Sequence, residues 1–295
     1  MKARQIMHPA DAKALQVLKQ ARGFNTMIKY FMQVGEERIM RGENLGTMLR
    51  VSPDNLPKVY TAFQEVVNCV GIDEPELYIY NDPVMNAYTY GDTRIFVALS
   101  SSLVERLTLP ELQSVMAHEC GHILCRHTLY KTVLHIIEDM GKAAQVITGS
   151  LAFPAYCALQ YWNRMSEYSA DRCAAAVVGE QVFQSALLKL TGGLSDIQGD
   201  PYQLVEQGKR YYEMKNASFF DRVQQACREM FYSHPQDCQR AYEIDRWKSS
   251  AAYRNLTKDL SANYHTLKSS ANYHTLTKDL TITNLPCKRV SPTQD

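Results

Sequence analysis

The chain has almost no net charge, because 32 Lys and Arg residues stand against 31 Asp and Glu residues among 295, for a formal charge of +1 at pH 7. A nucleic-acid-binding surface shows as a basic excess, so this balance argues against a nucleic-acid partner. Charged residues make up 21% and hydrophobic residues 45% of the chain, a globular composition that can bury a large core. The composition therefore disfavours both global disorder and a coiled-coil rod.

A secretory signal and paired cysteines are also missing. The opening sequence MKARQIMHPADAKAL has neither an apolar core nor a small-residue cleavage site. The eight cysteines include no CxxC pair. Because disulfide frameworks belong to secreted proteins, this pattern predicts reduced thiols and a cytoplasmic location.

Long apolar runs are scarce as well. A membrane-spanning helix needs about 20 mostly apolar residues, and the stretch 143–162 comes nearest to this requirement. The stretch contains several polar residues and has Pro154 near its middle. We expect a buried or interface-lying hairpin there, and we do not favour the alternative of peripheral membrane contact through this stretch.

Helical periodicity and short β-runs alternate along the rest of the chain. Apolar residues at helical spacing lie between Pro53 and Gly71, which predicts a helix between these two residues. Thr108 and Glu111 form a capping-box pattern at the start of another helix. Further predicted helices lie within 10–50 and at 164–178, 181–191 and 202–230, and predicted strands lie at 77–80 and 94–99. The pattern is typical of a mainly helical α+β chain with a small sheet.

The C-terminal part of the chain repeats itself. Residues 248–260 recur at 268–280 with 10 of 13 positions identical, and the seven residues that begin at Ser261 recur unchanged from Ser270. Units this short lie below the usual lengths of solenoid repeats. We therefore divide the chain into a domain at 1–247 and a repetitive extension at 248–295, which is either loosely ordered or docked as a helix.

The candidate functional site centres on the sequence His-Glu-Cys-Gly-His at residues 118–122. Residues four apart on a helix lie about 40° apart on one face, so the imidazoles of His118 and His122 can bind one Zn²⁺. Glu119 lies about 100° further round, where a general base for a water on the metal is needed. The motif predicts one zinc ion per chain; the alternative is an ordinary helix with two incidental histidines.

A catalytic zinc ion needs a third protein ligand. One known spacing places a histidine six residues after the second ligand, but Thr128 stands there, and His127 on the same helix lies about 140° from His122. Glu167, 45 residues beyond His122 on a second predicted helix, is the better candidate. Asp171 follows on the same face, where a carboxylate can orient a ligand imidazole. We expect Glu167 as the third ligand, although a Glu/Asp pair alone is typical of a solvated helix face.

On these residues the chain resembles zinc metallopeptidases of the HtpX/CAAX prenyl protease type (peptidase family M48). Three further segments resemble that family: Asn86-Ala87 its Asn-Ala motif, His234-Pro235 with Arg240 its C-terminal motif, and His8-Pro9-x-Asp11 the opening of soluble bacterial members. The resemblance covers about residues 8–245. The N-terminal transmembrane pair of HtpX has no counterpart in this sequence, which argues against membrane substrates. Conversely, the repetitive tail of this sequence has no counterpart in the family.

The resemblance implies a zincin-type fold, in which a small β-sheet lies over the active-site helix and its edge presents backbone groups to an extended peptide. It also implies Glu119 as the catalytic base and a histidine near the oxyanion, supported by an arginine. The implied zinc ligands are His118, His122 and Glu167. The implied catalytic residues are Glu119 and His234, and Asp171 and Arg240 support them. The implied substrate-binding residues are Asn86 and Ala87.

Two functions follow from this site. The first is a zinc-dependent metalloendopeptidase that hydrolyses peptide bonds by Glu-assisted attack of water, with a peptide or a partly unfolded protein as its partner. The alternative is a non-catalytic, zinc-stabilised module at 1–247 that binds peptide without cutting it. Chelator-sensitive cleavage of an unfolded protein such as casein distinguishes the two.

Overall fold

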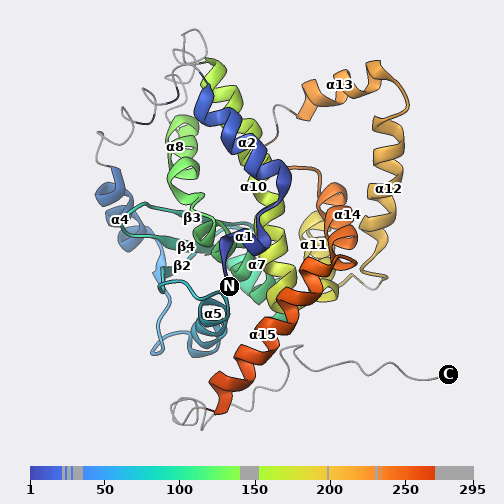
Figure 1. Cartoon of the computed structure of the whole chain (residues 1–295). Helices are drawn as coiled ribbons and strands as arrows, with labels where there is room; N and C mark the ends of the chain where they lie inside the picture. The colour runs from blue at the N-terminus through green and yellow to red at the C-terminus, as the bar shows by residue number, and fades with distance from the viewer. Residues whose placement is uncertain are drawn as a thin grey trace, which may run out of the picture.

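The structure is a computed structural model that describes residues 1–21, 24, 28, 36–139, 153–197, 199–229, 232 and 234–269. Helices surround a small β-sheet and a long helix, α10 (Phe153–Val178), that runs through the middle of the fold (Figure 1). This arrangement confirms the predicted α+β, mainly helical fold class. α10 contacts α2 (Pro9–Gln20), α7 (Leu109–Leu124), α8 (Thr128–Asp139) and α11 (Glu180–Gly192), so it links the N-terminal and C-terminal parts of the chain.

The sheet has four short strands in the order β1-β2-β4-β3. The strands are β1 (Leu49–Arg50), β2 (Glu76–Tyr80), β3 (Ala87–Tyr90) and β4 (Phe96–Ser100). β2 and β4 run parallel, with Leu77 opposite Val97, whereas β1 and β3 pair antiparallel with their neighbours. β2 and β4 confirm the two predicted strands; β1 and β3 were not predicted, because two to four residues are too few to show strand periodicity.

The strands β2, β3 and β4 carry buried side chains on both faces of the sheet, whereas β1 is exposed. Leu77, Val97 and Leu99 belong to the main hydrophobic core, which they share with α5 (Pro57–Val70) and α7. The other face carries a separate aromatic cluster of Tyr78, Tyr90 and Phe96 with Ala98. The sheet therefore packs on α5 and α7 with one face and fixes where the chain enters α7.

The start of α7 is anchored by its predicted capping box. The backbone N–H of Thr108 donates to Oε2 of Glu111 at 2.8 Å. Glu111 also accepts hydrogen bonds from Ser185 and Lys189 of α11. α6 (Ser101–Arg106) leads from β4 into this start, so the sheet, α7 and α11 are held in one arrangement. The predicted end of α5 is also confirmed, because Gly71 lies there in the left-handed conformation at φ 78°.

α7 and α10 approach each other closely at Gly121. A Cβ atom at this position would lie 2.7 Å from Cβ of Cys173 and 3.0 Å from Cα of Ala170. Glycine inside a helix costs about 1 kcal/mol relative to alanine, and the close approach explains its use here. The contact brings the α10 residues Glu167 and Asp171 beside the histidines of α7.

α10 begins earlier than the helix predicted at 164–178. Residues 153–162 of the expected hairpin form its first turns, and residues 143–152 lie outside the described residues. The predicted end at Gly179 is confirmed. None of the helices in the described part of the chain is both long and apolar enough to cross a bilayer.

The chain turns sharply after α7. Arg126 adopts the left-handed conformation at φ 59°, and α8 starts two residues later. The prediction that His127 continues the α7 helix is therefore wrong. No glycine or proline marks this turn in the sequence. The sequence-based prediction therefore extended the helix beyond its actual end.

The remaining helices with bounds in the described part of the chain are α1 (Ala3–Ile6), α4 (Glu36–Thr47), α12 (Gln203–Lys215), α13 (Phe219–Glu229), α14 (Asp237–Lys248) and α15 (Ala251–Ser269). The helical structure predicted at 202–230 is present as two helices, α12 and α13, and the Ser218 hydroxyl accepts from the N–H of Asp221 at the start of α13. In α15, Leu256 and Leu260 are buried in the main core. The extension from residue 270 lies outside the described residues.

Candidate metal centre

Two histidines of α7 and a glutamate of α10 bring their side-chain tips together. Nε2 of His118 lies 3.2 Å from Nε2 of His122 and 3.2 Å from Oε2 of Glu167. Nε2 of His122 lies 3.3 Å from Oε1 of Glu167. One ligand atom of each residue lies within 4.8 Å of the others, so the three residues can share a metal ion.

This donor set fits a zinc ion. Two imidazoles and one carboxylate are ligands of known catalytic zinc sites. Glu167 is fully buried, and its Oε2 lies 3.2 Å from Nε2 of His118 and 3.0 Å from Nδ1 of His234 without a hydrogen bond of good geometry to either. A buried acceptor without a well-aligned donor is unfavourable. Two ring nitrogens that face each other at 3.2 Å are also unfavourable unless one of them is protonated. A cation at the point where these atoms converge satisfies all three.

Two side chains from other segments contact Glu167. Nζ of Lys131 in α8 donates to Oε1 at 2.8 Å, and Nδ1 of His234 lies 3.0 Å from Oε2. Burial raises the pKa of Glu167, but Lys131 and His234 outweigh burial and hold this pKa well below its usual range. Glu167 is therefore an anion, as a metal-binding carboxylate must be.

Behind His118 lies a buried ion pair. Nδ1 of His118 is 2.9 Å from Oδ1 of Asp171, and Arg240 of α14 donates to the same carboxylate at 2.7 and 3.0 Å. Burial lowers the pKa of His118, but Asp171 and Glu167 outweigh burial and raise it to about 9. His118 thus carries a proton at neutral pH, which a metal ion must displace. The other carboxylate that Arg240 contacts is Asp237, at 3.3 Å.

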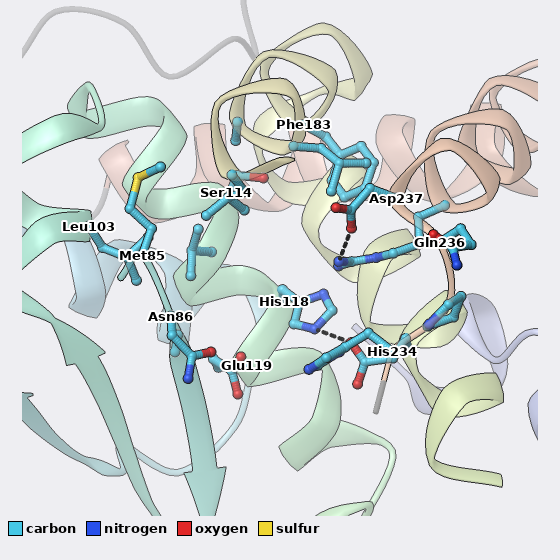
Figure 2. Close-up of a pocket in the computed structure, with 18 of the residues that line it drawn as sticks. Met85, Asn86, Leu103, Ser114, His118, Glu119, Phe183, His234, Gln236 and Asp237 are labelled. Atoms are coloured by element: carbon cyan, nitrogen blue, oxygen red, sulfur yellow. Dashed lines mark hydrogen bonds and ion pairs between the residues drawn. The ribbon is translucent and has the colours of Figure 1, made fainter. Parts of the chain in front are cut away.

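A cavity of about 440 Å³ opens beside the three ligand atoms. Figure 2 shows Asn86, Glu119, His118 and His234 around it, and Ala87 lines it as well. Burial raises the pKa of Glu119, partly opposed by His118, which brings this carboxylate closer to the pKa that a general base needs near neutral pH. The apolar part of the wall comes from α6, α7 and α11 and includes Leu103, Val115, Phe183, Leu187 and Leu190.

The structure thus brings all nine sequence-predicted site residues into one neighbourhood. Eight of them line the cavity or supply a ligand atom, and Asp171 lies directly behind His118. Sequence reasoning missed Lys131, because its position depends on the turn after α7. Asp237, which faces Arg240 across the cavity wall, was missed too, because a first-turn acidic residue is ordinary in any helix.

His127 is not among the three convergent ligands, but the prediction that its side chain is directed away from His122 is wrong. Nδ1 of His127 lies 2.9 Å from Nδ1 of His122, and Nε2 of His127 lies 3.1 Å from Oδ2 of Asp11 in α2. The turn at Arg126 causes this, because it brings the chain back toward α7. An offset of five residues places a side chain off the face only where the helix continues.

Comparison with known proteins identifies the family. The sequence profile of peptidase family M48 matches residues 53–248, more than half of the chain. The plastoglobule-localized metallopeptidase 48, chloroplastic, of Arabidopsis thaliana is 32% identical over 256 residues, covering 85% of this chain and 74% of that protein. Protease HtpX homolog 2 of Methanosarcina mazei is 24% identical over 183 residues, covering 53% of this chain and 62% of that protein. No solved structure matches the chain. The chain therefore belongs to peptidase family M48 and is a metallopeptidase.

Proposed function

We propose that this metallopeptidase is a zinc-dependent endopeptidase that cuts peptides or partly unfolded proteins. The observation that carries the proposal is the convergence of His118, His122 and Glu167 beside a cavity that also contains Glu119. The donor set takes one zinc ion per chain. A zinc ion held there supplies a Lewis acid that acidifies water and polarises a carbonyl group.

Glu119 is the proposed general base. It follows His118 directly on α7 and faces the cavity, so it reaches a water molecule beside the ligands without binding the metal itself. Its carboxylate accepts the proton of the attacking water and then passes it to the leaving amine. Proton transfer by a positioned side chain contributes roughly 10²- to 10⁴-fold to a rate.

His234 is the proposed donor to the developing oxyanion. It lies at the cavity wall just before α14, and its side chain is 48% exposed, so substrate can reach it. Its Nδ1 faces Glu167, which directs its other ring nitrogen away from the ligands. A donor positioned for charge that develops only in the transition state lowers the barrier to reaction.

The substrate is an extended peptide in this proposal. Asn86 and Ala87 line the cavity at the start of β3, and Ser100 of β4 fixes Asn86 through hydrogen bonds to its backbone N–H and C=O. Backbone groups at a strand end recognise extended chains, whereas side-chain pockets select sequence. The apolar wall on α6, α7 and α11 favours a substrate with an apolar side chain next to the cut bond.

The replacement Glu119→Gln tests the proposal. The variant keeps the three ligands, so it should bind one equivalent of zinc like the parent, and it should lose casein cleavage by about 10²-fold or more, because the base is gone. Glu105→Gln, on the exposed side of the neighbouring α6, is the matched control and should keep full activity. Equal activity of the two variants would refute the role of Glu119. Zinc binding without chelator-sensitive cleavage by the parent would favour the non-catalytic peptide-binding module.

We also propose that residues 1–247 form the catalytic unit and 248–295 an extension. Because Leu256 and Leu260 of α15 are buried in the main core, this extension contributes to stability even though its residues up to 269 supply no side chain to the site. A chain that ends at residue 248 should unfold at a lower temperature than the full chain while its zinc stoichiometry is retained. An unchanged melting temperature would contradict the stabilising role.

The cellular location is open to a direct test. The cysteine pattern favours the cytoplasm, whereas the name of the Arabidopsis relative places that protein at plastoglobules of the chloroplast. We propose the cytoplasm for this chain. Recovery of the full-length protein in a lipid-droplet or membrane fraction of its own cells would contradict this assignment.

A further inference from the structure

The second ligand histidine stands at the end of a buried row of polar side chains. From His122 the row runs to His127, with Nδ1 atoms 2.9 Å apart, and then to Asp11, with Nε2 of His127 3.1 Å from Oδ2. All three residues are 1% exposed or less. The row joins three separate segments of the chain, namely α7, the turn after it, and the N-terminal helix α2.

The hydrogen-bond partners of Asp11 assign the protons along this row. Asp11 accepts from Nε1 of Trp162 at Oδ1 and from the hydroxyl of Ser169 at Oδ2. Because both carboxylate oxygens of Asp11 face donors, Asp11 is an ionised acceptor. Burial raises the pKa of Asp11, but His127 and the other donors outweigh burial and lower it. Nε2 is the ring atom of His127 that lies beside this anion, at 3.1 Å although off the direction of an ideal hydrogen bond, so we assign the N–H of His127 to Nε2 and the lone pair to Nδ1.

The tautomer of His122 follows from that of His127. The lone pair on Nδ1 of His127 faces Nδ1 of His122 at 2.9 Å, so Nδ1 of His122 carries the hydrogen. Nε2 of His122 is left with its lone pair, and it is this atom that lies beside Glu167 and His118. Trp162 also packs edge-on against the ring of His127, which restricts rotation of that ring.

We propose that Asp11 and His127 are positioning residues that hold His122 as the Nδ1–H tautomer, with Nε2 directed at the metal ion. The inference rests on the metal site of the proposed function. It goes beyond that function, because it makes the N-terminal helix part of the site although α2 lies outside residues 53–248 that match the family profile. His118 has its carboxylate in direct contact, whereas His122 reaches one through an intervening imidazole.

Zinc affinity of purified variants tests the proposal. His127→Leu removes the acceptor for His122 and should weaken zinc binding about 10- to 100-fold in competition with a chelating dye. His127→Asn retains an acceptor atom close to the position of Nδ1 and should bind zinc more tightly than His127→Leu. Asp11→Asn should also weaken binding, because one amide oxygen cannot replace two carboxylate oxygens that accept from Trp162 and Ser169 and face the ring of His127.

A matched control separates positioning from general stability. Arg172 of α10 donates to the carbonyl of Met7, so it also ties the N-terminal segment to α10, but it has no contact with the row. Arg172→Gln should lower the melting temperature of the metal-free protein and leave the zinc dissociation constant within twofold of the parent. A His127→Leu protein that matches Arg172→Gln in both measurements would overturn the proposal.

The tautomer itself can be measured in the unmodified protein. With ¹⁵N-labelled histidine, the ring nitrogens of His122 in the metal-free chain should show a protonated Nδ1 and an unprotonated Nε2, and Asp11→Asn should alter this pattern. A protonated Nε2 on His122 in the parent would overturn the proposal. Absence of zinc binding by the parent would instead refute the metal site, and the ring nitrogens would still decide whether Asp11 and His127 set the tautomer.

Discussion

The two histidines of α7 are supported by different sets of residues. Nδ1 of His118 contacts the carboxylate of Asp171 directly, and that carboxylate is held by the Arg240 guanidinium. Nδ1 of His122 reaches the carboxylate of Asp11 through His127. The first arrangement uses α10 and α14, and the second uses the turn after α7 and the N-terminal helix.

The two sets also differ in charge. Asp171 has a buried cationic partner, whereas Asp11 is held by the neutral donors Trp162 and Ser169 and by His127. The His118 side thus depends on a buried ion pair. Removal of one partner leaves the other charge buried, which lowers the stability of the fold. The His122 side depends on the packing of α2 against α10. Loss of one carboxylate should therefore not have the same effect as loss of the other.

The largest expected effect is that of Asp171→Asn. It leaves the buried guanidinium of Arg240 with Asp237, 3.3 Å away, as its remaining carboxylate partner. Loss of one partner of a buried ion pair costs about 3–5 kcal/mol in the free energy of unfolding, so we expect a loss near the lower end of this range. Asp11→Asn should cost less, because no buried cation of fixed charge loses its partner. Urea denaturation of the metal-free proteins measures both. The double variant Asp171→Asn/Arg240→Gln should recover part of the loss, and equal losses for the two single variants would remove the contrast between the sides.

Gly121→Val should act on both sides at once. The added side chain meets Cys173 and Ala170, so it separates α7 from α10 and with them the histidines from Glu167. Overpacking of this kind costs about 1–3 kcal/mol of stability, and we expect zinc binding to fall below one equivalent. Gly42→Val in α4 is the control, because a side chain there meets nothing within 4 Å. A Gly121→Val protein with full zinc content would show that the close approach is dispensable.

The part of this site that spacing on a helix can predict is the part that lies on α7 and α10. His118 and His122, and likewise Glu167 and Asp171, are four residues apart on uninterrupted helices, so each pair shares a face. His127 and Lys131 follow a turn that no glycine or proline marks, and their direction was not predictable from the same rule. Asp11 comes from more than 100 residues earlier, and only the packing of α2 on α10 brings it to the site.

The fold shows the same division. The α5 helix and the α7 capping box were predicted because their signals are local, at Gly71 and at Thr108 and Glu111. Strands β1 and β3 exist because β2 and β4 offer them backbone partners, and a short strand has no periodicity of its own. Most of the elements and site residues that were not predicted therefore depend on contacts between distant segments of the chain.

The pH dependence of zinc binding should show which histidine carries a displaced proton. The pKa of His118 is raised to about 9, whereas burial and Lys131 hold the pKa of His122 well below its usual range. Below pH 9, zinc competes with the proton on His118, so the apparent affinity should rise about tenfold, or 1.4 kcal/mol, per pH unit and level off above pH 9. Calorimetry at pH 7 in two buffers of different ionisation enthalpy should detect release of about one proton per zinc.

The same proton bears on the stability of the metal-free protein. A histidine whose folded-state pKa is raised adds stability that is fully present below its unfolded pKa of about 6.5 and is lost as pH rises through 9. Zinc binding removes this contribution of the His118 proton to stability, because a zinc-bound histidine is unprotonated. Asp171→Asn should reduce proton release at pH 7, whereas Asp11→Asn should leave it unchanged. Equal release by the two variants would contradict the assignment of the proton to His118.

The smallest expected effect concerns the turn that creates the His122 side. Arg126 is exposed and adopts a left-handed conformation that costs a side-chain-bearing residue about 1–2 kcal/mol. Arg126→Gly relieves this cost but adds about 0.5–1 kcal/mol of chain entropy in the unfolded state, so the net gain in stability should be about 1 kcal/mol or less. Arg126→Ala keeps the strain and is the control. Zinc affinity should stay the same in both variants, because His127 keeps its place; a loss of stability in Arg126→Gly would mean that the arginine side chain, and not the backbone turn, holds His127 against His122.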